Sequence, residues 1–183
     1  MAITTREYAK INLEVSTLLQ KHKIKRPPVK IKDIAEGLSL EVVPHYIADN
    51  ISGVLMAKGT SGTIAFNPND PEVRQRFTIA HELGHFILHR KNSTSSEQLF
   101  IDRDFLVKYR SSNKYSPSEY EQEQQANAFA ATLLMPEEFV LAELAKIDYD
   151  DLTEIELIDA LARVFEVSPT AMTYRLANLD INV

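Results

Sequence analysis

The sequence predicts an α+β protein in which a small mixed β-sheet packs on one central helix. Apolar residues recur at helical spacing within residues 71–90, and again in the segment before Pro136. Short β-branched and apolar segments at 38–43, 51–57 and 63–67 are separated by turn-forming residues, as is typical of strands. With 183 residues, 44% of them hydrophobic and 25% charged, we expect one globular domain with at most a small appendage.

The first part of the chain is predicted to contain a long helix, a short helix and then strands. Residues 4–21 have the pattern of an amphipathic helix rather than of a signal peptide. Its apolar face carries Ile11, Val15, Leu18 and Leu19. Residues 31–36 add a short turn of helix, and residues 38–43 form a strand. The segments 51–57 and 63–67 are expected to pair as a hairpin around a turn.

The central helix is predicted to run from about Pro71 to about Arg90. Asp70 is the expected N-cap and Pro71 the first helical residue, since both residue types favour those positions. A glycine inside a helix costs roughly 1 kcal/mol relative to alanine. We therefore expect Gly84 to allow the close approach of another backbone or of a substrate.

His81, Glu82 and His85 lie within this helix and predict a zinc hydrolase site. Four residues turn a helix by only about 40° and advance it by about 6 Å, so both imidazoles leave the same face. Two imidazoles on one face can share a zinc ion, and a glutamate directly after the first can hold a metal-bound water without ligating the metal. Glu82 is therefore the expected catalytic base.

The third metal ligand is expected to be a carboxylate. A catalytic zinc site has three protein ligands and one open position. The chain has no cysteine, and a straight helix carries His89 about 12 Å from His81, too far to share the ion. We expect His89 either to contact a metal ligand from outside the coordination sphere or to cap the helix; a plain surface position is the alternative. No histidine follows residue 89.

A second helix, predicted to end at Pro136, is the best source of that carboxylate. Glu123 and Asn127 are four residues apart on the small-residue face that would pack against the central helix. Glu123 would ligate the metal, and Asn127 would bind the outer nitrogen of a zinc histidine and fix its tautomer. Glu121 is the alternative ligand, but it lies about 200° round the helix from Glu123, so both cannot face the metal.

Two segments of the chain resemble those of a known family. The segments His81–His89 (HELGHFILH) and Glu123–Pro136 (EQQANAFAATLLMP) together resemble the ImmA/IrrE family of zinc metallopeptidases. Weaker similarity at residues 27–31, 51–55 and 161–168 extends the resemblance over nearly the whole chain.

The resemblance implies a zincin-like core with a metal site. His81, His85 and Glu123 would be the zinc ligands, and Glu82 the catalytic base. One departure is Gln125, where the family often carries a second acid. Because residue 125 is expected to touch no ligand, this departure does not affect the predicted ligand set.

The resulting hypothesis is a zinc-dependent endopeptidase with Zn²⁺ as its cofactor. By resemblance, its substrate is a helix-turn-helix transcriptional repressor, whose cleavage relieves repression in a mobile-element, stress-response or toxin–antitoxin context. The alternative is a non-catalytic, zinc-stabilised binding module that docks on a repressor or on DNA. Glu82 favours the enzyme, because a structural zinc site has four protein ligands and no use for a base.

The hairpin before the central helix is a candidate substrate groove. An edge strand beside the metal can hold an extended substrate by backbone pairing. The candidate groove residues are Ile51, Ser52, Gly53, Val54 and Leu55. A purely structural hairpin explains the same pattern equally well.

Residues 91–118 carry the weakest pattern, and strands or an extended arm could form between 99 and 109. Amide hydrolysis builds negative charge on oxygen, which a nearby donor stabilises. The candidate donors are Arg103, Tyr109, Arg110, Tyr115 and Tyr120. The sequence does not select one of them.

The C-terminal residues are predicted to form a pair of helices that resembles a helix-turn-helix. A helix over 136–147 precedes them, a capping box at Thr153 and Glu156 opens the first of the pair, and Ser168 opens the second. We assign residues 1–147 to the peptidase core and residues 148–183 to helices packed on it. The second helix offers few positive charges, so we expect no direct DNA binding.

Charge and composition limit the partners and the cellular location that can be expected. The net charge is −6, yet residues 21–32 hold six Lys or Arg and no acid. Such a run is usually a solvated linker and otherwise contacts an acidic partner or a phosphate backbone. The absence of cysteine suits a reducing compartment, so a cytoplasmic location is expected. No apolar run approaches the ~20 residues that cross a bilayer, and the oligomeric state stays open.

Overall fold

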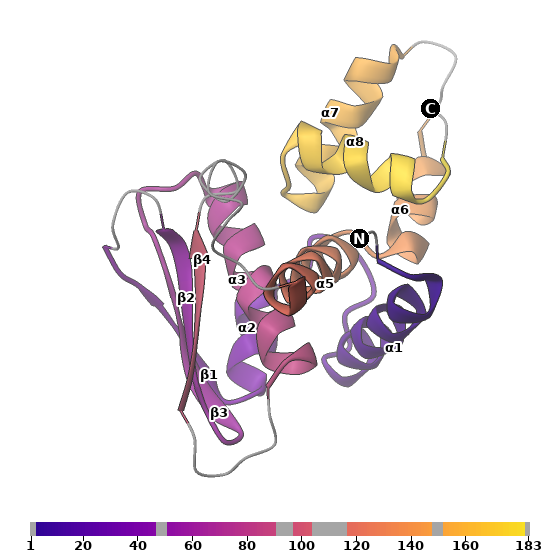
Figure 1. Cartoon of the computed structure of the whole chain (residues 1–183). Helices are drawn as coiled ribbons and strands as arrows, with labels where there is room; N and C mark the ends of the chain where they lie inside the picture. The colour runs from indigo at the N-terminus through magenta and orange to yellow at the C-terminus, as the bar shows by residue number, and fades with distance from the viewer. Residues whose placement is uncertain (1–2, 47–50, 91–96, 104–116, 148–151, 182–183) are drawn as a thin grey trace.

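A computed structural model describes residues 3–46, 51–90, 97–103, 117–147 and 152–181. The α+β fold class is confirmed: helices cover one face of a mixed sheet (Figure 1). The strands are β1 (Leu40–Pro44), β2 (Ile51–Lys58), β3 (Ser61–Phe66) and β4 (Glu97–Arg103). The helices are α1 (Thr5–Lys21), α2 (Ile31–Gly37), α3 (Glu72–Leu88), α5 (Pro117–Leu134), α6 (Glu137–Leu144), α7 (Glu154–Phe165) and α8 (Pro169–Asn178).

The sheet has the order β1-β3-β2-β4, which places β2 in its interior. β2 runs antiparallel to both neighbours, whereas β1 and β3 are parallel. Val54, for example, pairs with Ala65 on one side and with Ile101 on the other. The expectation that Ile51–Leu55 form an edge strand open to a substrate is therefore wrong. The cause is β4, which comes from the weakly patterned segment and covers that side of β2.

The central helix α3 begins at Glu72, slightly later than predicted. Pro71 is its N-cap, with φ −55° and ψ 148°, so the expectation of Asp70 as the N-cap is wrong. The backbone N–H of Asp70 instead donates to the carbonyl of Asn67 at 3.3 Å, within the turn that precedes the helix. Extending that turn by one residue moves the helix start past the proline.

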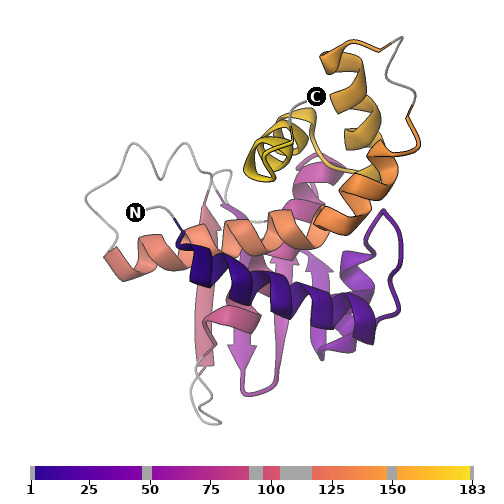
Figure 2. The same cartoon turned by 90° about the vertical axis from the view of Figure 1, so that its right-hand side faces the viewer.

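Helices pack on the sheet in successive layers. α3 lies on the sheet, α5 packs on α3, and α1 lies along α5, as the indigo and orange helices in Figure 2 show. The contact between α3 and α5 is close at Gly84, where an added Cβ would lie 3.2 Å from both the Cα and the carbonyl oxygen of Ala126. The prediction that Gly84 allows another backbone to approach closely is therefore confirmed.

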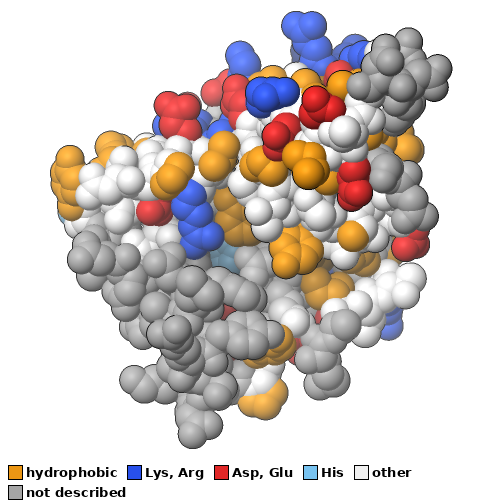
Figure 3. Space-filling model, turned by 90° about the horizontal axis from the view of Figure 1, so that it is seen from above, with side chains coloured by type: hydrophobic (Ala, Val, Ile, Leu, Met, Phe, Trp, Pro, Cys, Tyr) orange, Lys and Arg blue, Asp and Glu red, His pale blue; other side chains and the backbone are white. Residues whose placement is uncertain are grey.

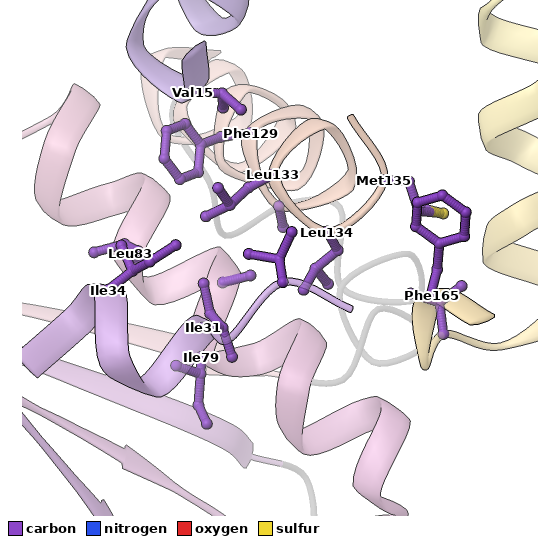
Figure 4. Packing of buried hydrophobic residues seen from close by; sticks show 14 of the residues in the cluster. Val15, Ile31, Ile34, Ile79, Leu83, Phe129, Leu133, Leu134, Met135 and Phe165 are labelled. Carbon is purple, nitrogen blue, oxygen red and sulfur yellow. The ribbon is translucent and has the colours of Figure 1, made fainter. Parts of the chain in front are cut away.

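One apolar core joins these layers to the C-terminal helices. Leu83 of α3, Phe129 of α5 and Val15 of α1 meet between the layers, and Phe165 packs beside Met135 at the far end (Figure 4). Each of these side chains is buried. Among the described helices, none combines the length and apolar character that crossing a bilayer demands.

The C-terminal helices begin where the sequence predicts. Thr153 and Glu156 form the capping box of α7, and Ser168 caps α8. Arg175 of α8 is buried and donates to the carbonyl of Met135 at 2.8 Å and to the hydroxyl of Tyr8 at 2.7 Å. These bonds tie α8 to the end of α5 and to α1. The boundary at residue 147 stays a prediction.

Gly84→Ala should destabilise the protein although it favours the helix. Overpacking costs about 1–3 kcal/mol, whereas replacing glycine in a helix interior gains about 1 kcal/mol. The contact at Gly84 is with backbone atoms of Ala126, which cannot rotate away. We expect the free energy of unfolding to fall by about 1 kcal/mol, measured by chemical denaturation. A variant more stable than the parent would show that α5 moves without cost.

Candidate metal centre

Three side chains from two helices converge on one point: His81 and His85 of α3, and Glu123 of α5. The Nε2 atoms of the two histidines are 3.1 Å apart. The Glu123 carboxylate oxygens lie 3.6 Å from His81 Nε2 and 3.4 Å from His85 Nε2. Ligand atoms about 2.0–2.2 Å from a tetrahedral metal are about 3.3–3.6 Å from one another. The donor set, two imidazoles and a carboxylate, suits a metal ion; both distances to Glu123 lie in this range, and the distance between the imidazoles is slightly shorter.

Asn127 sets the tautomer of His81. The Nδ1 atom of His81 lies 2.9 Å from Asn127 Oδ1, one turn beyond Glu123 on α5. A carbonyl oxygen only accepts hydrogen bonds, so Nδ1 carries the proton and the Nε2 lone pair points at the convergence point. The structure places Asn127 where the sequence reasoning expected it.

His89 contacts the second ligand from the end of α3. Its Nδ1 atom is 3.1 Å from His85 Nδ1, and its Nε2 atom is 2.9 Å from Gln125 Oε1. His89 is also the C-cap residue, with its backbone N–H bonded to the carbonyl of His85. Burial lowers the pKa of His89 to about 4, so the ring is neutral at neutral pH.

Glu82 is fully buried beside the histidines, between α3 and the sheet. β2 passes directly over it at Gly53, where an added Cβ would lie 3.2 Å from Glu82 Oε1 and only 2.3 Å from Thr78 Cγ2. Gly53 was expected in a substrate groove; the structure places it against the proposed base instead. A side chain at this position would clash with Thr78 and press against the carboxylate.

The centre is recessed below the surface. The exposed fractions of the side chains are 1% for His81, 3% for His85 and 19% for Glu123. Histidine atoms are visible at the floor of a hollow in the face shown in Figure 3. The ring of Phe100, from the edge strand β4, stacks on His85 with 4.8 Å between centroids and 25° between planes. Apolar contact therefore shields one side of the centre from water.

Several residues that the sequence suggested for the site lie away from the metal centre or outside the described residues. Glu121, the rival ligand, is exposed and lies 3.4 Å from the amide nitrogen of Gln125. Among the oxyanion candidates, Tyr120 is exposed and accepts a hydrogen bond from Gln124. The backbone of Arg103 lies in β4. Tyr109, Arg110 and Tyr115 lie outside the described residues.

Two contacts were missed by the sequence reasoning. Phe100 lies in the weakly patterned segment, where alternation alone did not distinguish a strand from an arm. Glu7 of α1 accepts a hydrogen bond from Gln125 Nε2 at 2.6 Å. The spacing of Thr4 and Glu7 is that of a capping box, which signals a helix start but not a contact with α5.

Comparisons with known proteins agree with this geometry. Residues 35–177 match the family model Peptidase_M78, described as an IrrE N-terminal-like domain. A solved structure of a Mycobacterium tuberculosis transcriptional regulator is similar, with a TM-score of 0.61 and 14% sequence identity; the match covers 92% of this chain and 46% of the regulator. This chain thus spans less than half of the regulator's length, and the likeness is one of fold. No curated protein sequence matches.

The pKa of Glu7 should report on the start of α1. Hydrogen bonds from the side chain and backbone of Thr4, and then from Gln125, lower this pKa to about 2. Since the folded value is below the unfolded one, the ionised carboxylate stabilises the fold above about pH 4.5, and that contribution is lost as the pH falls through about 2.

Thr4→Ala should therefore raise the pKa of Glu7 towards its ordinary value, as measured by NMR titration of the side-chain carboxyl. The stability difference between parent and variant should shrink between pH 4.5 and pH 2. An unchanged pKa in Thr4→Ala would contradict the capping geometry.

Proposed function

The chain belongs to the Peptidase_M78 family of IrrE N-terminal-like domains, a family of metallopeptidases, and from this premise we propose that it is a zinc-dependent endopeptidase. One observation carries the proposal: the convergence of His81, His85 and Glu123 on one point, with the buried Glu82 directly after His81 in α3. Two imidazole nitrogens and one carboxylate would hold the metal, and three protein ligands are the number found in catalytic rather than structural zinc sites.

The ligands would be held in the correct protonation state before the metal binds. Asn127 keeps the proton of His81 on Nδ1, so that Nε2 is available to the ion. A zinc ion bound there supplies Lewis acidity, which lowers the pKa of water and polarises a peptide carbonyl. The stacked ring of Phe100 holds the plane of His85.

Glu82 is the general base in this proposal. As the oxygen of a water molecule bonds to the peptide carbonyl carbon, Glu82 accepts one proton from that water. When the bond from carbon to nitrogen breaks, the same carboxylic acid gives the proton to the departing amine. Its burial suits this task, because a carboxylate in a dry site is held in one place and exchanges its proton locally.

We infer that the substrate is a helix-turn-helix repressor, cleaved in the cytoplasm to relieve repression in a mobile-element, stress-response or toxin–antitoxin context. This inference comes from the family resemblance. Direct DNA binding receives no support, since Arg175 of the last helix is buried. In Figure 3, acidic and basic side chains are intermingled and form no basic stripe on the described surface of that face.

Glu82→Gln should retain zinc and lose about 10²- to 10⁴-fold in kcat, the usual contribution of a general base. The measurement is cleavage of the repressor encoded beside the gene, read on a gel with and without a chelator, together with zinc content by atomic absorption. His81→Ala is the control that should lose both metal and activity. Equal cleavage by Glu82→Gln and the parent would remove Glu82 as the base; a stable complex with no chelator-sensitive fragment would support the binding module instead.

Gly53→Ala should lower kcat without removing the metal. The new Cβ would clash with Thr78 Cγ2 at 2.3 Å, so β2 and α3 must shift apart at the helix turn that carries Glu82, whose Oε1 would lie 3.2 Å from the same Cβ. A misplacement of about 1 Å can cost about 10²-fold in rate. Adding Thr78→Ser removes the methyl group in the way, and the double variant should recover most of the activity. Full activity in Gly53→Ala alone would show that Glu82 tolerates displacement.

A further inference from the structure

A continuous chain of hydrogen bonds links α1 to the metal centre. Glu7 accepts from Gln125 Nε2 at 2.6 Å, Gln125 Oε1 faces His89 Nε2 at 2.9 Å, and His89 Nδ1 faces His85 Nδ1 at 3.1 Å. This series of hydrogen bonds begins at Glu7, outside residues 35–177, which match the family model, and ends at His85, a proposed ligand. Nothing in the peptidase mechanism above uses Glu7 or Gln125.

The direction of each bond in this chain follows from its first member. An ionised carboxylate only accepts hydrogen bonds, so Glu7 requires the amide nitrogen of Gln125 to face it. The carboxylate of Glu121, 3.4 Å from the same nitrogen, favours the same orientation. Gln125 therefore presents its oxygen to His89, and an amide oxygen also only accepts.

The two histidines then have one consistent assignment. His89 must carry its proton on Nε2 to donate to Gln125, and a neutral imidazole has only one N–H. His89 Nδ1 is thus an acceptor, so His85 must carry its proton on Nδ1. The remaining lone pair of His85 is on Nε2, the atom that faces His81 and Glu123.

We propose that Glu7 and Gln125 are positioning residues that hold His85 in its metal-binding tautomer. Thr4 makes Glu7 a fixed starting point, since its hydroxyl and backbone N–H bind Oε2 and leave Oε1 for Gln125. The glutamine at position 125 thereby transmits the charge of Glu7 to the centre. Asn127 holds the tautomer of His81 in the same way, so each imidazole has its own hydrogen-bonding partner outside the ligand set. This role rests on the proposed function, because it concerns the same metal.

The test compares histidine tautomers and zinc affinity in four proteins: the parent, Glu7→Gln, Gln125→Leu, and the double variant Glu7→Gln, Gln125→Glu. Tautomers are read from side-chain nitrogen chemical shifts of the ¹⁵N-labelled, metal-free full chain, and affinity from competition with a chromophoric zinc chelator. Glu14→Gln is the matched control, because Glu14 lies on the same helix and, in the described part of the chain, makes no hydrogen bond or ion pair.

In the parent, His85 should be protonated on Nδ1 and His89 on Nε2. Gln125→Leu removes the acceptor and should weaken zinc binding by about 10- to 100-fold, the usual effect of losing a partner behind a ligand. Glu7→Gln lets either end of the amide at position 125 face His89, so His85 protonated on Nε2 should appear, with a loss of about 3- to 10-fold. The double variant restores an acceptor-only group at position 125 and should return both readouts towards the parent.

Three outcomes would overturn the proposal: His85 protonated on Nε2 in the parent, tautomers in Gln125→Leu that match those of Glu14→Gln, or no recovery in a folded double variant. These readouts do not depend on cleavage. A protein that binds zinc with the expected tautomers but cuts no repressor would contradict the proposed function and leave this role intact. A protein that cuts the repressor but keeps the same histidine tautomers in Glu7→Gln would contradict this role and leave the proposed function intact.

Discussion

The close packing of α3 on α5 is the constraint on which the rest of the site depends. Two histidines on α3 cannot complete a catalytic zinc site alone, because the third ligand must come from a second helix at a fixed distance. Gly84 makes that distance possible by leaving room for the backbone of Ala126. Glu123 lies one turn before Ala126 on the face that this contact brings towards α3. Packing between backbones therefore decides the geometry of the metal centre.

The sheet and the outer helix restrict the centre from two further directions. β2 passes over Glu82 at Gly53 with no space for a side chain, and Phe100 of β4 stacks on His85. On the opposite side, α1 packs along α5 and brings Glu7 to Gln125. Each layer of the fold thus supplies one contact to the site. Among the described residues, the neighbours of the centre lie on helices and strands, which position side chains more precisely than loops do.

Buried imidazoles also need a defined protonation state, and hydrogen bonds from outside the ligand set supply it. Asn127 is suited to this for His81 because its oxygen can only accept. His89 can either donate or accept, so its effect on His85 depends on what lies behind it. Such a network has one set of hydrogen-bond directions only if the group at its end can act in one way. An ionised carboxylate meets this condition, because it can only accept hydrogen bonds. In the proposed arrangement, Gln125 therefore acts on the centre through His89, although it touches no ligand itself.

The local sequence alone predicted most of the elements and the candidate ligands. Helical spacing identified α3 and α5, and the interval between His81 and His85 placed both imidazoles on one face. The capping box at Thr153 and Glu156 marked the start of α7, because such a signal lies within four residues. By contrast, β2 was wrongly expected at an edge of the sheet, and a strand was only one of two possibilities for the segment that forms β4. Its pairing with β2 joins residues 39 to 52 positions apart, from Lys58 with Glu97 to Ile51 with Arg103, and local periodicity carries no information about such partners.

What the sequence determined by itself was therefore the chemistry: which side chains share a helix face, and that two imidazoles and a carboxylate suit zinc. Tertiary structure decided everything that depends on contact between distant segments. It made β2 an interior strand, placed Gly53 over Glu82, and joined Glu7 to Gln125 across 118 positions. The physical reason is that side-chain direction follows from the local backbone, whereas proximity between elements follows from how all the apolar faces pack at once.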